Sequence, residues 1–207
     1  MEFQNHLLYH LFKWSIVSPV LHTYFRVRIH GAEHVPPTGP LTVVSNHASN
    51  FDPPIVSNCV RRPVAYMAKE ELFRIPIFKQ AIQLYGAYPV RRGAVARQAM
   101  QTAQDFLKQG WAIGIFLQGT RTPDGRIDKP KLGAANIAAK VQSPLLPVSL
   151  WGTEKILQAG SPLPHPVPLT IRIGEAIAPP ASSDRDDLQA TTDRLTTTIN
   201  ALHALGR

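Results

Sequence analysis

Short apolar runs alternate along the chain with longer stretches in which apolar residues recur at helical spacing. A short apolar run bounded by turn residues is typical of a buried strand, and an i, i+3, i+4 pattern is typical of an amphipathic helix. The predicted strands span residues 27–30, 41–45, 85–92, 111–117, 145–151 and 169–177. The predicted helices span residues 67–84 with an interruption at Pro76, 94–109, 133–141 and 183–205. This alternation predicts an α/β fold, with a mixed and mostly buried sheet sandwiched by helices.

Residues 3–25 combine many large apolar and aromatic side chains with scattered basic ones. The composition predicts one helix, or two around Pro19, lying in a membrane interface with the aromatic rings at headgroup level. The alternative is a helix packed on the protein's own core, but the aromatic residues exceed what one core face needs. We therefore divide the chain into an N-terminal interfacial segment, residues 1–26, and a single domain, residues 27–207.

The sequence contains no apolar stretch of the about eighteen residues that a spanning helix needs, and no signal-peptide pattern is evident. We expect a peripheral, monotopic membrane protein on the cytoplasmic face. The single cysteine, Cys59, excludes an internal disulfide and fits a reducing compartment. Cys59 lies in an apolar stretch and is predicted to be a core residue, because no cysteine-enzyme signature surrounds it to favour a nucleophile.

The net charge of +8 indicates an anionic partner, which could be nucleic acid, a phosphate-bearing substrate or an anionic membrane. The basic residues are concentrated between Arg61 and Arg97, where only Glu70 and Glu71 oppose them. No signature of an RNA- or DNA-binding module accompanies this stretch. We therefore expect no nucleic-acid partner, and the charge alone keeps a nucleic-acid binder as a minor alternative.

His47 follows a predicted strand, and Asp52 lies five residues further on, directly before Pro53. In a regular helix five residues correspond to about 500° of rotation, so the two side chains would not share a face. They can meet only if His47 lies in a strand-to-helix turn and Asp52 at a helix start, which the Asp-Pro pair indicates. Such a pair suits general-base activation of a hydroxyl, because Asp52 would leave one imidazole nitrogen free to accept a proton. The alternative is that Asp52 only caps the helix.

Several common catalytic patterns are absent from the sequence. It contains no Gly-x-Ser-x-Gly elbow, no His-Glu-x-x-His or Cys/His spacing, no Gly-x-Gly-x-x-Gly after a strand and no phosphate loop ending in Lys-Ser/Thr. We therefore expect neither a metal site nor a cofactor.

Two further segments offer anion-binding chemistry after predicted strands. Arg91 and Arg92 end one strand, and guanidinium groups bind phosphate through two parallel hydrogen bonds; the alternative is a solvated charge pair. Gly119, Thr120 and Arg121 follow the most apolar strand, where the carboxyl end of a sheet opens to a ligand. Glycine allows close backbone approach, threonine supplies a hydroxyl and arginine supplies an anion-binding fork.

In order and spacing these segments resemble the 1-acyl-sn-glycerol-3-phosphate acyltransferase family, the glycerophosphate and lysophosphatidate acyltransferases of phospholipid biosynthesis. The blocks of that family are Asn-His-x-Ser-x-x-Asp, a Gly with an Arg six residues on, Phe-x-Glu-Gly-Thr-Arg, and a Pro that follows apolar residues and opens a strand. The matching residues are Asn46, His47, Ser49 and Asp52; Gly86 and Arg92; Phe116, Gly119, Thr120 and Arg121; and Pro147. The resemblance covers residues 27–177.

The resemblance implies an O-acyltransferase in which His47, oriented by Asp52, activates the free hydroxyl of a lysophospholipid, above all 1-acyl-sn-glycerol-3-phosphate. The alkoxide would attack the thioester of acyl-CoA or of acyl carrier protein, and no cofactor is implied beyond that co-substrate. The expected partners are membrane phospholipids, the lysophospholipid acceptor and, as one donor, acyl carrier protein. The resemblance assigns Arg92, Gly119, Thr120 and Arg121 to the acceptor's phosphate, and Asn46, Ser49, Gln118 and Pro147 to supporting roles.

One residue departs from the family's pattern. Gln118 stands where the third block usually has Glu, so the side chain keeps a carbonyl acceptor but loses its charge. This change leaves open an acyltransferase with another lysolipid acceptor, and a weakly active or non-catalytic lipid-binding homologue.

Overall fold

Seven strands form one sheet in the computed structural model, which describes residues 10–74, 79–80, 82–83, 86–90, 96–157 and 163–207. The strand order is β1-β7-β6-β2-β5-β3-β4, and all neighbours are parallel except β6 and β7. The strands are β1 (Arg28–His30), β2 (Leu41–Ser45), β3 (Val64–Lys69), β4 (Ala87–Val90), β5 (Ala112–Phe116), β6 (Leu145–Trp151) and β7 (Thr170–Ile173). The predicted α/β class with a mixed sheet is confirmed.

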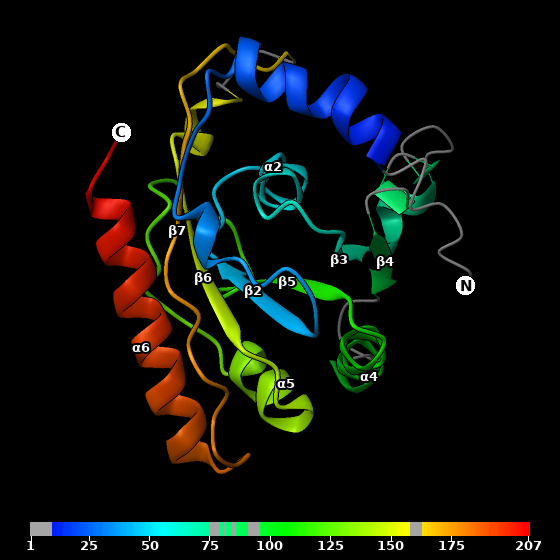
Figure 1. Cartoon of the computed structure of the whole chain (residues 1–207), viewed down its shortest axis with the longest axis vertical. Helices are drawn as coiled ribbons and strands as arrows, with labels where there is room; N and C mark the ends of the chain where they lie inside the picture. Colours follow the sequence, from blue (N-terminus) through cyan, green and yellow to red (C-terminus); the bar gives the residue numbers. More distant parts are fainter. Residues whose placement is uncertain (1–9, 75–78, 81, 84–85, 91–95, 158–162) are drawn as a thin grey trace.

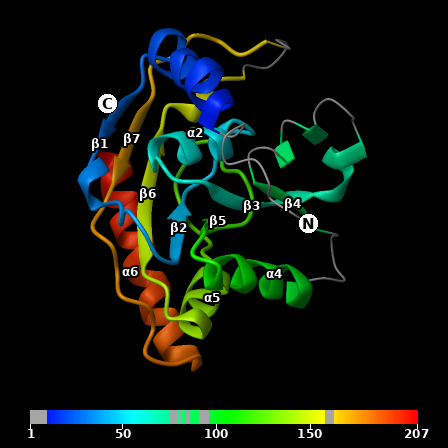
Figure 2. The same cartoon turned by 45° about the vertical axis from the view of Figure 1, so that its right-hand side comes forward.

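Helices cover both faces of the sheet (Figures 1 and 2). On one face lie α2 (Asp52–Cys59) and the N-terminal helix, which includes η1 (Lys13–Val17) and η2 (Val20–Tyr24). On the other face lie α4 (Ala96–Lys108), α5 (Gly133–Val141) and α6 (Arg185–Ala204). Short 3-10 helices follow three strands: η3 (Ala32–His34), η4 (Glu70–Arg74) and η5 (Thr153–Lys155).

The central strand β2 is buried on both faces, as its continuous apolar sequence predicts. Val43 packs on the α2 side in a cluster with Ile55 and Val56, whereas its neighbour Val44 packs on the opposite side with Leu195 and Ile199. Successive side chains of a strand point to opposite faces, so one short run supplies both halves of the core.

The prediction of a helix over residues 67–84 is wrong in its first part. Residues 64–69 form strand β3, which pairs with both β4 and β5, and the 3-10 helix η4 follows. Pairing on both edges and burial of Val64, Ala65 and Tyr66 outweigh the helix propensity of the Lys-Glu-Glu-Leu sequence that follows. Residues 79–80 and 82–83 are helical, and the rest of 75–85 lies outside the described residues.

The N-terminal helix runs without a break from His10 through Pro19 to Tyr24, so one helix forms here rather than two. Its inner side packs on the core through Leu21 and is followed by the buried Phe25. Lys13 is also buried, with its Nζ 3.5 Å from the carbonyl oxygen of Ser57 on α2. The same helix exposes five large apolar side chains: Leu11, Trp14, Ile16, Val20 and Tyr24. The helix therefore packs on the domain and still presents an apolar surface.

In the part of the chain that the structure describes, no helix combines the length and the apolarity needed to cross a bilayer.

The five strands β2 to β6 run in one direction, so their carboxyl ends lie at one edge of the sheet. His47 follows β2 at this edge, and Gln118–Arg121 follow β5. Because Ser45 at the end of β2 is in register with Phe116 at the end of β5, the two segments emerge side by side. Parallel sheets commonly bind ligands at this edge.

Candidate active site

His47 and Asp52 are in direct contact. Nδ1 of His47 lies 2.7 Å from Oδ2 of Asp52, which is fully buried. The same carboxylate oxygen accepts hydrogen bonds from the backbone N–H groups of Ala48, at 2.7 Å, and Ser49, at 2.8 Å. Three donors therefore hold the carboxylate in place, and the carboxylate in turn holds the imidazole so that Nδ1 donates the hydrogen bond.

Asp52 is not the cap residue of α2. The residue before the helix is Phe51, which cannot cap it with a hydrogen bond from its side chain, and Asp52 and Pro53 are the first helical residues. The Asp52 carboxylate turns back to the preceding loop instead. This is the strand-to-helix arrangement that the spacing of the two residues requires, and the interpretation of Asp52 as a cap is wrong.

The imidazole of His47 stacks on the ring of Phe116, with centroids 3.9 Å apart and planes 13° apart. The side chain is 17% exposed, so it is covered on most sides but still reachable from solvent. Among the described residues, Nε2 has no hydrogen-bond partner. An imidazole that donates through Nδ1 carries its lone pair on Nε2, which is therefore available to accept a proton from a substrate.

The loop that follows β5 is anchored beside His47. The backbone N–H of Thr122 donates to the carbonyl oxygen of His47 at 2.8 Å, and its hydroxyl donates to the same oxygen at 3.3 Å. Arg121, the neighbour of Thr122, is exposed at the same edge of the sheet, as is Thr120. The structure thus brings the third block of the sequence next to the first.

Gly119 adopts a φ of +71°, a left-handed conformation that favours glycine. A Cβ at this position would lie 3.1 Å from Nζ of Lys131, so an ammonium group lies against the Gly119 backbone. Lys131 is exposed and closes the same loop, with its N–H bonded to the carbonyl of Leu117 at 2.9 Å. Sequence reasoning missed Lys131. The sequence feature that could have indicated Lys131 is its positive charge at the end of a turn-rich loop.

Gln118 shapes this loop through its side-chain carbonyl. Oε1 accepts hydrogen bonds from the backbone N–H groups of Asp128, at 2.8 Å, and Lys129, at 3.1 Å. A glutamate could accept the same two bonds, so the glutamine retains this function of the side chain without the charge.

Asn46, the residue before His47, joins three segments of the chain. Its amide nitrogen donates to the carbonyls of Gly125, at 2.7 Å, and Leu150, at 2.9 Å, and its oxygen accepts from Leu150 N–H at 2.8 Å. Ser49 is buried, and its hydroxyl accepts from the N–H of Phe51 at 3.3 Å. Both residues act on the backbone that positions His47 and Asp52.

One predicted site residue lies within a strand of the sheet. Pro147 is buried within β6 opposite Val44, where its carbonyl accepts from Gly174 N–H at 2.9 Å, so these contacts belong to the sheet. Arg92 lies outside the described residues, as does Arg91.

The far side of the loop is held by the C-terminal helix α6, which sequence reasoning did not connect with the site. Asn200 accepts from Ile127 N–H at 3.0 Å and donates to its carbonyl at 2.9 Å. Nε2 of His203 donates to the carbonyl of Asp124 at 3.0 Å. The loop is therefore fixed from both sides.

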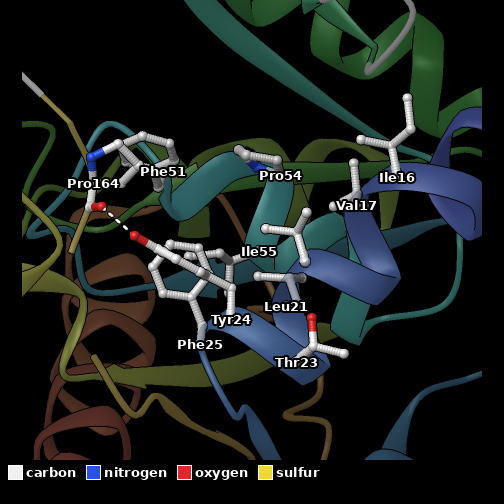
Figure 3. Close-up of a pocket in the computed structure, with 11 residues that line it drawn as sticks. Ile16, Val17, Leu21, Thr23, Tyr24, Phe25, Phe51, Pro54, Ile55 and Pro164 are labelled. Carbon is white, nitrogen blue, oxygen red and sulfur yellow. Dashed lines mark hydrogen bonds between the residues drawn. The ribbon is translucent and has the colours of Figure 1, made fainter. Parts of the chain in front are cut away.

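An apolar pocket of about 540 Å³ adjoins the turn between β2 and α2 (Figure 3). The N-terminal helix contributes Val17, Val20 and Leu21, and the start of α2 contributes Pro54 and Ile55. Phe51, the residue before Asp52, also lines the pocket. Its rim is closed by a hydrogen bond from the Tyr24 hydroxyl to the carbonyl of Pro164, at 2.7 Å. The pocket thus lies between the N-terminal helix and α2, the helix that begins with Asp52.

Burial shifts the pKa of two side chains, Cys59 of α2 and Lys13 of the N-terminal helix. Desolvation raises the pKa of the Cys59 thiol to about 12, against the opposing effect of Lys13 and Arg61, so this buried cysteine is not a thiolate nucleophile. Desolvation likewise lowers the pKa of Lys13 to about 8. Within the described ranges, no group of three or more His, Cys, Asp or Glu could hold a metal ion.

Comparisons with known proteins agree with this geometry. The family model described as Acyltransferase matches residues 26–151. The chain is 31% identical over 151 residues to the chloroplastic 1-acyl-sn-glycerol-3-phosphate acyltransferase of Arabidopsis thaliana, covering 72% of this chain and 42% of that protein. It is 30% identical over 130 residues to the 1-acyl-sn-glycerol-3-phosphate acyltransferase of Borreliella burgdorferi, covering 62% of this chain and 52% of that one.

A solved structure is similar over nearly the whole chain. It is the crystal structure of the 1-acyl-sn-glycerophosphate (LPA) acyltransferase PlsC from Thermotoga maritima, with a TM-score of 0.73 and 28% identity. The match covers 93% of this chain and 82% of that one. The chain spans about half the length of the curated relatives it matches. Residues 26–151, which the family model matches, contain the His47–Asp52 pair and the loop after β5. By fold, by sequence and by the placement of the His47–Asp52 pair beside the loop after β5, the chain belongs to the acyltransferase family.

Proposed function

We propose that the protein transfers a fatty acyl group to the free hydroxyl of 1-acyl-sn-glycerol-3-phosphate, giving phosphatidic acid. The observation behind this proposal is the contact between His47 and the buried Asp52, at 2.7 Å, next to a loop that presents Arg121. A general base beside an anion-binding loop suits an acceptor that has both a hydroxyl and a phosphate. The relatives' names point to the same reaction.

In the proposed reaction, Nε2 of His47 takes the proton from the acceptor hydroxyl as its oxygen attacks the thioester carbonyl carbon. The new C–O bond forms, the C–S bond breaks, and the imidazolium returns its proton to the departing thiolate. Asp52 stabilises the imidazolium through the hydrogen bond to Nδ1. The donor is a thioester of CoA or of acyl carrier protein, and no cofactor takes part.

The acceptor's phosphate is proposed to bind at the loop after β5. Arg121 and the ammonium group of Lys131 supply positive charge there, and Gly119 leaves its backbone open to close approach. Thr120 supplies a hydroxyl. Arg92 is proposed, from the family's pattern, to bind the same phosphate.

The apolar pocket is the proposed site for an acyl chain. It is lined by side chains of the N-terminal helix and reaches Phe51, the neighbour of Asp52. A chain that lies in this pocket would have its carbonyl end near the catalytic turn, and burial of its methylene groups would contribute about 0.8 kcal/mol each.

Gln118 motivates the two alternatives, another lysolipid acceptor or a non-catalytic lipid-binding homologue. Its Oε1 accepts two backbone hydrogen bonds within the loop, which a glutamate could also accept. Because the loop can keep its shape with glutamine, an active enzyme is favoured, and a homologue that has lost its activity is disfavoured.

The test is to identify the lipid products of the purified protein by mass spectrometry, over a panel of lysophospholipid acceptors with acyl-CoA and with acyl carrier protein thioesters. Phosphatidic acid is expected as the main product, and Gln118→Glu is expected to change its rate by less than about threefold, because both side chains can brace the loop. A different preferred acceptor would correct the substrate. No transfer by either form would favour the binding protein.

The outer side of the N-terminal helix is proposed to anchor the protein as a monotopic protein on the cytoplasmic face of the membrane. Leu11 and Trp14 are 59% and 58% exposed, and Ile16, Val20 and Tyr24 of the same helix are exposed as well. An amphipathic helix with aromatic residues of this kind lies in the membrane interface. This position would hold the mouth of the apolar pocket close to the lipid.

Replacing Leu11, Trp14 and Ile16 together with serine is expected to lower binding to anionic phospholipid vesicles by at least about tenfold, since each side chain contributes roughly 1.5–3 kcal/mol when buried. Vesicle co-sedimentation measures the change. The matched control is Leu205→Ser, which removes an equally exposed leucine at the end of α6 and should leave binding unaltered. Equal binding by the triple variant and the parent would place the anchor elsewhere.

A further inference from the structure

Three aromatic rings form a stack that ends at the catalytic histidine. The imidazole of His47 lies over Phe116, with centroids 3.9 Å apart and planes 13° apart. Phe116 in turn stacks on Tyr66, with centroids 5.7 Å apart and planes 24° apart. The rings come from the end of β5, from β3 and from the turn after β2, which are neighbouring parts of the sheet.

A glycine makes room for the stack. Gly114 on β5 is in register with Tyr66 on β3, and a Cβ at Gly114 would overlap the Tyr66 ring. Gly114 has an ordinary strand conformation, so backbone freedom does not require glycine there. The absence of a side chain is what allows the Tyr66 ring to lie across β5 toward Phe116.

The stack and the carboxylate restrict different motions of the imidazole. The bond from Nδ1 to Asp52 fixes which edge of the ring faces the protein, and contact with a flat ring limits tilting of the imidazole plane. Together they leave Nε2 pointing away from Asp52 along one direction. A general base needs this alignment with the proton it removes.

The face of Phe116 also suits the charge that develops on His47. When the imidazole accepts a proton it becomes a cation, and a cation over the face of an aromatic ring is attracted by the ring's negative face. The attraction is absent before the proton moves, so it favours the transition state over the bound substrate.

We propose that Phe116 is a positioning residue for His47. Tyr66 supports the ring of Phe116, and Gly114 leaves the space that this arrangement of the two rings needs. This inference rests on the proposed function, since it assumes that His47 is the general base. It predicts that loss of the stack lowers kcat and leaves the KM for the acceptor nearly unaltered, because the stack acts on the base and has no part in holding the phosphate.

Phe116→Leu keeps an apolar side chain but removes the flat ring. We expect kcat to fall about tenfold with KM within about twofold of the parent, and Phe116→Tyr to restore kcat to within about threefold. Gly114→Ala should lower kcat like Phe116→Leu, because the Tyr66 ring must move. The matched control is Gly133→Ala, where a Cβ meets no atom within 4 Å, and it should behave as the parent.

A nuclear magnetic resonance measurement on the protein with labelled histidine separates the stack from general folding effects. A stacked ring shifts the His47 ring-proton resonance upfield, and His47→Gln identifies that resonance among the eight histidines. We expect the upfield shift in the parent and in Phe116→Tyr, and its loss in Phe116→Leu. Thermal unfolding of each variant reports stability, so Phe116→Leu decides the question even if Gly114→Ala does not fold.

An unaltered kcat in folded Phe116→Leu that has lost the upfield shift would overturn the proposal, and so would a parent protein without the shift. These outcomes differ from a failure of the proposed function. If the parent protein transfers no acyl group to any acceptor, the proposed reaction is rejected together with this role of Phe116, whereas an active parent with an active Phe116→Leu rejects the role of the stack alone.

Discussion

Replacing His47 with alanine is expected to lower kcat for acyl transfer by about 10²–10⁴-fold, the usual contribution of a general base. Asp52→Asn should also lower kcat, because an amide cannot stabilise the imidazolium and can impose the wrong tautomer on His47. KM for the acceptor should change little in both variants, since neither side chain is proposed to bind the phosphate. Initial rates with labelled acyl thioester measure the effect.

Two exposed residues of the same types provide controls for this pair. His30→Ala on β1 and Asp186→Asn on α6 remove a histidine and a carboxylate away from the turn after β2, and both should retain the parent's rate. Circular dichroism and thermal unfolding should show folded protein in all four variants. Near-normal transfer by folded His47→Ala would exclude His47 as the base, whatever the result for Asp52→Asn.

Asn46→Leu is expected to lower the free energy of unfolding by at least about 3 kcal/mol. The substitution leaves the carbonyls of Gly125 and Leu150 and the N–H of Leu150 without their partner in a buried site. Each such group costs about 1–3 kcal/mol, against a total stability of about 5–15 kcal/mol for a typical domain. The midpoint of urea denaturation measures the loss.

Acyl transfer should fall in the same variant, because Gly125 belongs to the loop that presents Arg121 beside His47. Asn136→Leu is the matched control: this half-buried asparagine lies on α5, away from the catalytic turn, and its replacement should cost less than about 1 kcal/mol. A midpoint for Asn46→Leu equal to that of Asn136→Leu would show that the three hydrogen bonds do not stabilise the domain.

The sequence by itself determined the class of fold and the bounds of several elements. Strands β2 and β6 and helix α5 begin and end where the apolar pattern predicted them, because burial on both faces of a strand, or on one side of a helix, leaves a pattern in local sequence. The spacing of His47, Asp52 and Pro53 also required a strand-to-helix turn, since no regular helix could bring the two side chains together.

Only the tertiary structure decided which distant residues meet. β3 took the place of the first residues of a predicted helix because it has strand partners on both edges, and those partners lie elsewhere in the chain. The contacts of Asn46 with Leu150 span 104 residues, and Lys131 reaches Gly119 across a loop. Local periodicity records how buried a position is but not its neighbour, and the neighbour depends on the order of strands in the sheet. The stack of Tyr66, Phe116 and His47 therefore became visible only once β3 and β5 were paired.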